Sequence, residues 1–208
     1  MKFLITLVFL FFALNVEAAT YWTDGTNGSD ANGCNNSASP LTTTAKLTIN
    51  AGIAGLSAGD SLSVRGGTYT GNVNFDGTAG TAANRITIQA HTDEIVTLRP
   101  PGNSYILATW NQARYLTISG FTFDANGATA NLILIGGGTF GLNDGGSNNV
   151  LVTNCTVFGG GNSPVLIANA ANSAVVVDNT FSKCKVHSNK ILGSPGEGHG
   201  IYIGIRAQ

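Results

Sequence analysis

The chain has 208 residues, with 10 Lys and Arg against 11 Asp and Glu. Only 10% of its residues are charged, whereas roughly 25% is usual for a soluble domain. Hydrophobic residues make up 43%, and there are 28 Gly, 22 Asn and 23 Thr. This composition excludes a helical bundle, and also a disordered chain, because disordered chains are highly charged and poor in large apolar residues. A net charge of −1 offers no basic field for nucleic acid.

Residues 1–18 have the features of a secretory signal peptide. After a basic start, an apolar run extends from Phe3 to Leu14, and small residues follow up to Ala18. The run is shorter than the roughly 20 residues that a membrane-spanning helix needs. We therefore expect cleavage after Ala18, a secreted or periplasmic mature chain, and no membrane span.

One local pattern recurs in residues 116–123, 150–157 and 174–181. Each segment has an aliphatic residue at its third position, a small turn-forming residue at its fifth, Thr at its seventh and an apolar residue at its eighth. The third positions are Ile118, Val152 and Val176, and the fifth positions are Gly120, Asn154 and Asp178. Earlier strands extend the series through Val64 and Ile88, so the pattern returns every 24 to 34 residues.

Further short apolar strands are expected between these repeats, at residues 73–75, 96–98, 132–135, 165–167 and 201–203. A sandwich or barrel has no reason to reuse one pattern at this period. In a solenoid, by contrast, each coil buries its inward side chains on the equivalent residues of the next coil. The sequence therefore predicts an all-β fold, a parallel β-helix in which residues 61–208 form four or five coils.

The segment before the coils differs in kind and is expected to cap the solenoid. Residues 24–39 form a polar loop, and residues 44–56 have a helical apolar spacing through Ala45, Ile49 and Ile53. A solenoid has to cover the open strand edge of its first coil. Residues 19–60 are thus interpreted as an N-terminal cap containing a short helix.

Several segments together resemble a known group of proteins. They are Tyr21-Trp22, Gly28–Asp30, Ala58–Tyr69, Gly80, Asn84–Ala90 and Tyr115–Phe121. On these residues the chain resembles the secreted right-handed parallel β-helix proteins of the pectate lyase-like superfamily. The resemblance implies that fold and an acidic polysaccharide partner. It assigns no reaction, since the superfamily includes lyases, polygalacturonases, epimerases and surface proteins.

The lyases of this group imply a first function, β-elimination of a pectate-like or alginate-like chain. A Lys or Arg base removes a proton beside a uronate carboxylate, which calcium or another cation neutralises. The acids in the coils, Asp124, Asp144 and Asp178, are widely spread. Asp124 and Asp178 are the candidate metal ligands, and stabilisation of turns is the alternative role for them.

Residues 182–200 are the part of the chain in which charged and titratable groups gather. The segment contains Lys183, Lys185, His187, Lys190, Glu197 and His199. Insertions on a rigid scaffold often carry function. Lys183, Lys185, His187 and Glu197 are predicted to contact an acidic sugar chain. The alternative is a solvated loop without a ligand.

The end of this segment, Gly198-His199-Gly200, looks like a motif of the polygalacturonases. An inverting glycosidase also needs paired carboxylates, and the chain has neither the Asn-Thr-Asp nor the Asp-Asp motif of that family. His199 and Lys190 are the candidate catalytic residues. Three functions stay open at this point: a lyase-like enzyme, a non-catalytic glycan-binding or cell-surface β-helix, and a polygalacturonase-type hydrolase.

Three cysteines, Cys34, Cys155 and Cys184, occur in the expected mature chain. An exported protein can form disulfides, but three cysteines allow at most one internal bridge. Their spacing matches no metal-binding motif. We expect small, buried or half-buried thiols.

The sequence stops at Gln208, soon after the expected strand at 201–203. A last coil without a cap would expose a strand edge, which invites aggregation. The chain is therefore expected to be the N-terminal portion of a longer protein.

Overall fold

Three parallel sheets surround one apolar core in the computed structural model, which describes residues 17–33, 43–137, 146–159, 164–169, 180–187 and 201–204. Sheet A contains β1 (Thr20–Thr23), β2 (Ser61–Val64), β5 (Ile86–Ala90), β8 (Arg114–Ser119), β11 (Asn148–Thr153) and β14 (Thr180–Ser182). Sheet B contains β3 (Gly67–Thr70), β6 (Val96–Arg99), β9 (Phe121–Asp124), β12 (Thr156–Phe158) and β15 (Lys185–His187). Sheet C contains β4 (Val73–Asn74), β7 (Leu107–Thr109), β10 (Ile133–Gly137), β13 (Val165–Asn169) and β16 (Ile201–Gly204).

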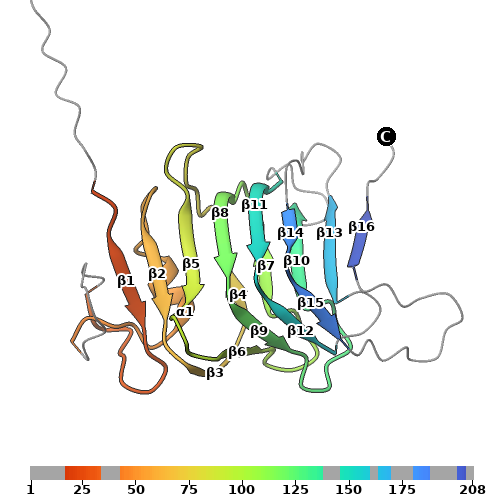
Figure 1. The fold of residues 1–208 in the computed structure, drawn as a ribbon, viewed down its shortest axis with the longest axis horizontal. Coiled ribbons are helices and arrows are strands. Elements are labelled where there is room, and N and C mark those ends of the chain that lie inside the picture. Colours follow the sequence, from red (N-terminus) through yellow and green to blue (C-terminus); the bar gives the residue numbers. More distant parts are fainter. Residues whose placement is uncertain are drawn as a thin grey trace, which may run out of the picture.

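The chain visits the sheets in the order A, B, C and then returns to A one strand further along. Each strand thus pairs with the strand one turn earlier and one turn later. Figure 1 shows the result, with the colours running from red to blue along the long axis of the molecule. The predicted fold, a right-handed parallel β-helix with a short cap helix, is confirmed. No helix among the described residues is long and apolar enough to cross a membrane.

The core consists of inward side chains stacked in register from turn to turn. On sheet A, Leu62 lies opposite Ile88, and Ile88 lies opposite Ile118. All three are at most 1% exposed. Adjacent strands are about 4.8 Å apart, so each of these side chains packs directly on its equivalents above and below. The alternating outward residues of the same strands, such as Thr87 and Thr117, are partly exposed.

The turn from sheet A to sheet B contains one residue with positive φ in three consecutive turns. Gly120 has a φ of 83°, Asn154 of 53° and Lys183 of 51°. Glycine adopts this left-handed conformation without a steric penalty and Asn tolerates it, whereas a long side chain such as Lys is less suited to it. This sharp turn is what redirects the chain between two sheets without a loop.

The register of the β14 turn corrects the sequence prediction. Phe181, not Val176, lies opposite Val152, and Lys183, not Asp178, has the turn position after the strand. Asp178 itself lies outside the described residues. A segment rich in apolar residues satisfies the repeat pattern in more than one frame, and only the hydrogen bonding of β14 to β11 selects the correct one.

The first turn shows a smaller shift of the same kind. Ile88 lies opposite Leu62 and not opposite Val64, which pairs with Ala90 instead. Both Leu62 and Val64 are fully buried. Because inward positions alternate along a strand, either residue satisfies the apolar pattern, so the pattern alone does not fix the register.

Strand β7 was not among the predicted strands. Residues 106–108 form a short buried apolar run, and β7 joins β4 to β10 in sheet C. The run is Ile-Leu-Ala, which is short and lacks the alternation of apolar and polar residues that marks most strands. The feature that could have predicted β7 is the place of this run one turn after the expected strand at Val73.

The cap is built around a short helix, α1 (Ile49–Ile53), within the expected residues 44–56. Thr48 accepts a hydrogen bond from the backbone N–H of Ala51 as the N-cap residue. A Cβ at Gly52 would lie 2.7 Å from Oγ1 of Thr23 and 2.8 Å from Cδ1 of Leu62. Glycine at this position therefore lets α1 pack directly on β1 and β2.

Asn50 protects the edge of sheet C. Its side-chain amide donates to the carbonyl of Asn72 at 2.8 Å and accepts from the backbone N–H of Asn74 at 3.0 Å. These are the groups of β4, the edge strand of sheet C, that a further strand would otherwise pair with. One side chain thus replaces part of a missing neighbour strand.

Some sequence predictions lie outside the described residues. They are most of the signal peptide, residues 1–16, together with Cys34 and Asp144. The boundaries of the cap and of the coils stay predictions.

Replacing Asn50 by Ala removes both hydrogen bonds to β4. We expect the free energy of unfolding to fall by about 1 kcal/mol, since each bond is partly exposed to solvent. The measurement is denaturant unfolding monitored by circular dichroism. Asn84→Ala is the matched control, because Asn84 is an exposed turn residue that bonds through its backbone, and it should change the stability by less than about 0.5 kcal/mol. Equal effects of the two substitutions would contradict the role of Asn50.

Candidate functional site

The connections from sheet B to sheet C lie side by side along one corner of the β-helix. We call residues 70–74, 100–106 and 125–132 the B–C edge. Asn72 donates to Oγ of Ser104 at 3.1 Å and to the carbonyl of Tyr105 at 2.6 Å. In the next pair of connections, Oδ1 of Asn103 accepts from the backbone N–H of Thr129 at 2.8 Å and from its hydroxyl at 3.1 Å. Side-chain amides therefore tie each connection to the following one.

Two adjoining grooves follow this edge. The first has a volume of about 600 Å³ and is lined by Gly25, Leu47–Asn50 and Thr68–Asn74. The second has a volume of about 430 Å³ and is lined by Thr70, Pro100–Asn103 and Ala125–Ala128. Thr70 lines both grooves, so they adjoin one another along the axis of the β-helix.

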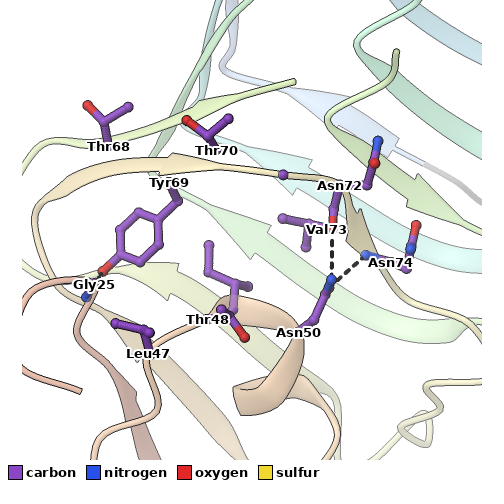
Figure 2. Close-up of a pocket in the computed structure, with 12 residues that line it drawn as sticks. Gly25, Leu47, Thr48, Asn50, Thr68, Tyr69, Thr70, Asn72, Val73 and Asn74 are labelled. Atoms are coloured by element: carbon purple, nitrogen blue, oxygen red, sulfur yellow. Dashed lines mark hydrogen bonds between the residues drawn. The ribbon is translucent and has the colours of Figure 1, made fainter. Parts of the chain in front are cut away.

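The first groove is lined by uncharged side chains. Figure 2 shows Leu47, Thr48 and Asn50 of the cap on one side and residues 68–74 on the other. The hydroxyl of Tyr69 donates to the carbonyl of Arg65 and accepts from the N–H of Gly25, both at 2.9 Å. Burial raises the pKa of Tyr69, so its hydroxyl stays protonated at neutral pH. The groove offers hydrogen bonds and apolar contact but no titrating group.

The outer face of sheet B continues from the grooves. Its outward positions form two columns in register. The first column is Thr68, Thr97, Thr122, Thr156 and Lys185, and the second is Thr70, Arg99, Asp124 and Phe158. Phe158 is 43% exposed, which is unusual for a side chain of this size. The face thus combines a line of hydroxyls with one exposed aromatic ring.

Asp124, a candidate metal ligand, is engaged by protein groups. Its Oδ2 lies 2.8 Å from Nη2 and 2.9 Å from Nε of Arg99, and its Oδ1 accepts from the N–H of Asn126 at 2.9 Å. Among the described residues, no group of three or more His, Cys, Asp or Glu side chains is placed to hold a metal ion. These contacts match the alternative interpretation of Asp124, stabilisation of a turn.

Two of the predicted basic residues lie where the chain turns from sheet A into sheet B, and not at the B–C edge. Lys183 lies in the turn between β14 and β15, and Lys185 begins β15; both are exposed. His187 ends β15, opposite Phe158 in register. Lys185 therefore continues the first outward column of sheet B.

The other predicted site residues, Lys190, Glu197 and His199, lie outside the described residues. They belong to the segment that connects β15 with β16, which is a connection from sheet B to sheet C. The topology therefore relates this segment to the connections that form the B–C edge in earlier turns.

The prediction from sequence missed the grooves themselves. The residues that form them are clusters of turn-forming types directly after strands of sheet B, at residues 71–72, 100–103 and 125–128. Their recurrence one turn apart was the available indication, but it becomes visible only when β3, β6 and β9 are known to be stacked.

Comparisons with known proteins give one structural likeness. No protein-family model matches the chain, and no curated protein matches it. A solved structure of a rhamnogalacturonan lyase is similar over 80% of this chain and 51% of that chain, with 15% sequence identity and a TM-score of 0.47. The chain thus spans about half the length of that lyase. The features that carry weight for function are accordingly those of the chain's own parallel β-helix, its grooved B–C edge and the outer face of sheet B.

Proposed function

We propose that the protein is a secreted β-helix that binds an acidic polysaccharide along the B–C edge. The proposal rests on one observation above all, that two grooves on neighbouring turns share Thr70 and adjoin along the helix axis. Compact ligands are usually enclosed in a single concave pocket. Shallow grooves repeated from turn to turn fit an extended ligand with repeating units.

The chemistry of the lining suits a sugar chain. Thr68 and Thr70 carry hydroxyls that can both donate and accept hydrogen bonds, as sugar hydroxyls do. Leu47, which is 40% exposed, offers an apolar surface to the C–H groups of a pyranose ring. The hydrogen bonds between neighbouring connections hold the groove in place before a ligand arrives, which lowers the entropic cost of binding.

The exposed lysines support an acidic rather than a neutral chain. Lys183 and Lys185 lie at the end of the described outer face of sheet B, and the connection after β15 adds Lys190. Charge-assisted hydrogen bonds from Lys to a carboxylate are stronger than neutral ones. A uronate chain that follows the grooves towards these lysines would form such charge-assisted hydrogen bonds through its carboxylates.

A bulky side chain at Thr70 should block the binding edge where the grooves meet. We expect Thr70→Trp to weaken binding of polygalacturonate or alginate roughly tenfold or more, a loss of about 1.4 kcal/mol. The measurement is isothermal titration calorimetry. Thr87→Trp is the matched control, because Thr87 is a partly exposed strand residue on the outer face of sheet A. If Thr70→Trp binds as tightly as the wild type, the chain does not use this edge.

Removing the lysines should weaken binding through charge. We expect the triple substitution Lys183→Ala, Lys185→Ala and Lys190→Ala to lower affinity for these uronate chains about tenfold at low salt, since each exposed charge contributes only a few tenths of a kcal/mol to about 1 kcal/mol. The difference should shrink as ionic strength rises. Replacement of the same three residues by Arg keeps the charge and should keep the affinity. Unchanged affinity of the Ala variant would show that the ligand is not acidic or lies elsewhere.

A lyase is the second candidate function. It is suggested by the composition of residues 188–200, which stand between β15 and β16 in the sequence and include Lys190 and His199. In this proposal one of these two residues removes the proton beside the uronate carboxylate. Such a step is most efficient when the pKa of the base lies near the working pH. Calcium is the cation that would neutralise the carboxylate.

Product analysis distinguishes the candidates. β-Elimination yields an unsaturated uronate that absorbs in the ultraviolet, whereas hydrolysis of the polygalacturonase type yields new reducing ends without that absorbance. If the protein is a lyase, we expect ultraviolet absorbance to rise with polygalacturonate or alginate and calcium, and this rise to be lost in Lys190→Ala or His199→Ala. Binding without either product, with and without calcium, would identify a non-catalytic glycan-binding protein.

A further inference from the structure

We infer that Cys155 and Cys184 are a redox site of the β-helix, and that they form a disulfide between consecutive turns when the protein meets a disulfide oxidant. Both are free thiols in the structure. They follow the equivalent turn residues Asn154 and Lys183, and each stands directly before a strand of sheet B, β12 and β15 respectively. The inference concerns the scaffold and does not depend on the proposed ligand.

The register places the two cysteines opposite each other. Thr153 pairs with Ser182 and Thr156 pairs with Lys185, and the N–H of Lys185 donates to the carbonyl of Cys155 at 2.9 Å. Neighbouring parallel strands are about 4.8 Å apart. This separation lies inside the range of roughly 4.4–6.8 Å that Cα atoms joined by a disulfide adopt.

The side chains also share one orientation. Sγ of Cys155 donates to the carbonyl of Thr153, and Sγ of Cys184 donates to the carbonyl of Ser182, each at 3.1 Å and each two residues back in the chain. The backbone N–H of Cys155 points to Sγ of Cys184 at 3.4 Å. The two thiols are therefore stacked on the same side of their strands and need little rearrangement to meet.

The environments of the thiols assign different roles to them. Interaction with the side chain and the backbone N–H of Cys155 lowers the pKa of Cys184 to about 7. The pKa of Cys155 is raised by the same interaction and by burial, and its residue is 1% exposed. A half-buried thiol with a lowered pKa attacks a disulfide first, because the thiolate is the nucleophile.

The reaction proceeds by two exchanges with a small disulfide such as oxidised glutathione. The Cys184 thiolate attacks one sulfur of the oxidant and forms a mixed disulfide with it. The other half of the oxidant leaves as a thiolate, which takes up a proton. Cys155 then loses its proton and attacks Sγ of Cys184, which releases the second thiolate, and that thiolate takes up a proton. Two protein thiols are oxidised and one oxidant disulfide is reduced to two thiols.

The bridge would join the turn before β12 to the turn before β15. Lys183 and Lys185 flank Cys184 on either side, so the disulfide would hold the backbone of both residues against the preceding turn of the helix. It would also stabilise the fold by lowering the conformational entropy of the unfolded chain between the two cysteines.

Peptide mapping tests the pairing directly. The full chain is equilibrated with oxidised glutathione, quenched with acid, alkylated and digested with trypsin. Trypsin cleaves after Arg114, Lys183 and Lys185, so the bridged product is the peptide 115–183 linked to the dipeptide Cys184-Lys185. We expect this product to predominate, and to be absent after reduction. Recovery of Cys155 and Cys184 as alkylated thiols, or of either one linked to Cys34, would overturn the inference.

Thermal unfolding provides the second readout. We expect the oxidised wild type to melt roughly 5–10 °C above the reduced protein. Cys34→Ser should retain this difference, whereas Cys184→Ser should abolish it. Cys184 is the residue chosen for substitution because it is only half buried. An equal melting temperature of oxidised and reduced wild type, or a difference that depends on Cys34, would count against the bridge.

Discussion

The fold depends on the stacking of inward side chains between parallel strands about 4.8 Å apart. Leu62, Ile88, Ile118 and Val152 illustrate the constraint, since each lies opposite the next on sheet A. In such a stack each turn contributes one strand to each sheet, and each strand places one side chain at a given inward position. The inner surface of the helix is therefore nearly invariant along its axis, and differences between turns are left to the connections.

This constraint also creates the need for a cap. A stack of strands has unpaired N–H and C=O groups at its first member, and they have to be covered or bonded. Helix α1 covers the core with Ile49 and Ile53, while Asn50 bonds the edge strand of sheet C. The cap residues then form one wall of the first groove. The same short segment thus protects the edge and forms one side of a groove.

Variation between turns is concentrated at the corner between sheets B and C for the same reason. The inward positions are filled by core side chains, and the turn from A to B has only one or two residues in the later turns. The connections from B to C have room to vary, and their Asn, Thr and Gly residues produce grooves with hydrogen-bonding walls. The low charge of the chain matches this arrangement, because the Thr column on sheet B and the groove linings need no ionised groups.

The sequence by itself determined the class of fold, since the recurrence of an apolar strand and a turn residue every 24 to 34 residues is compatible with a solenoid and with little else. It also indicated the cap helix and the basic residues near the end of the chain. Tertiary structure decided the register, replacing Val176 by Phe181 as the partner of Val152, because a period of two allows several frames and only strand pairing selects one. It alone placed Cys155 against Cys184, and it alone joined separate turn clusters into one grooved edge. Residues from different turns become neighbours through stacking, and their separation along the chain does not predict that contact.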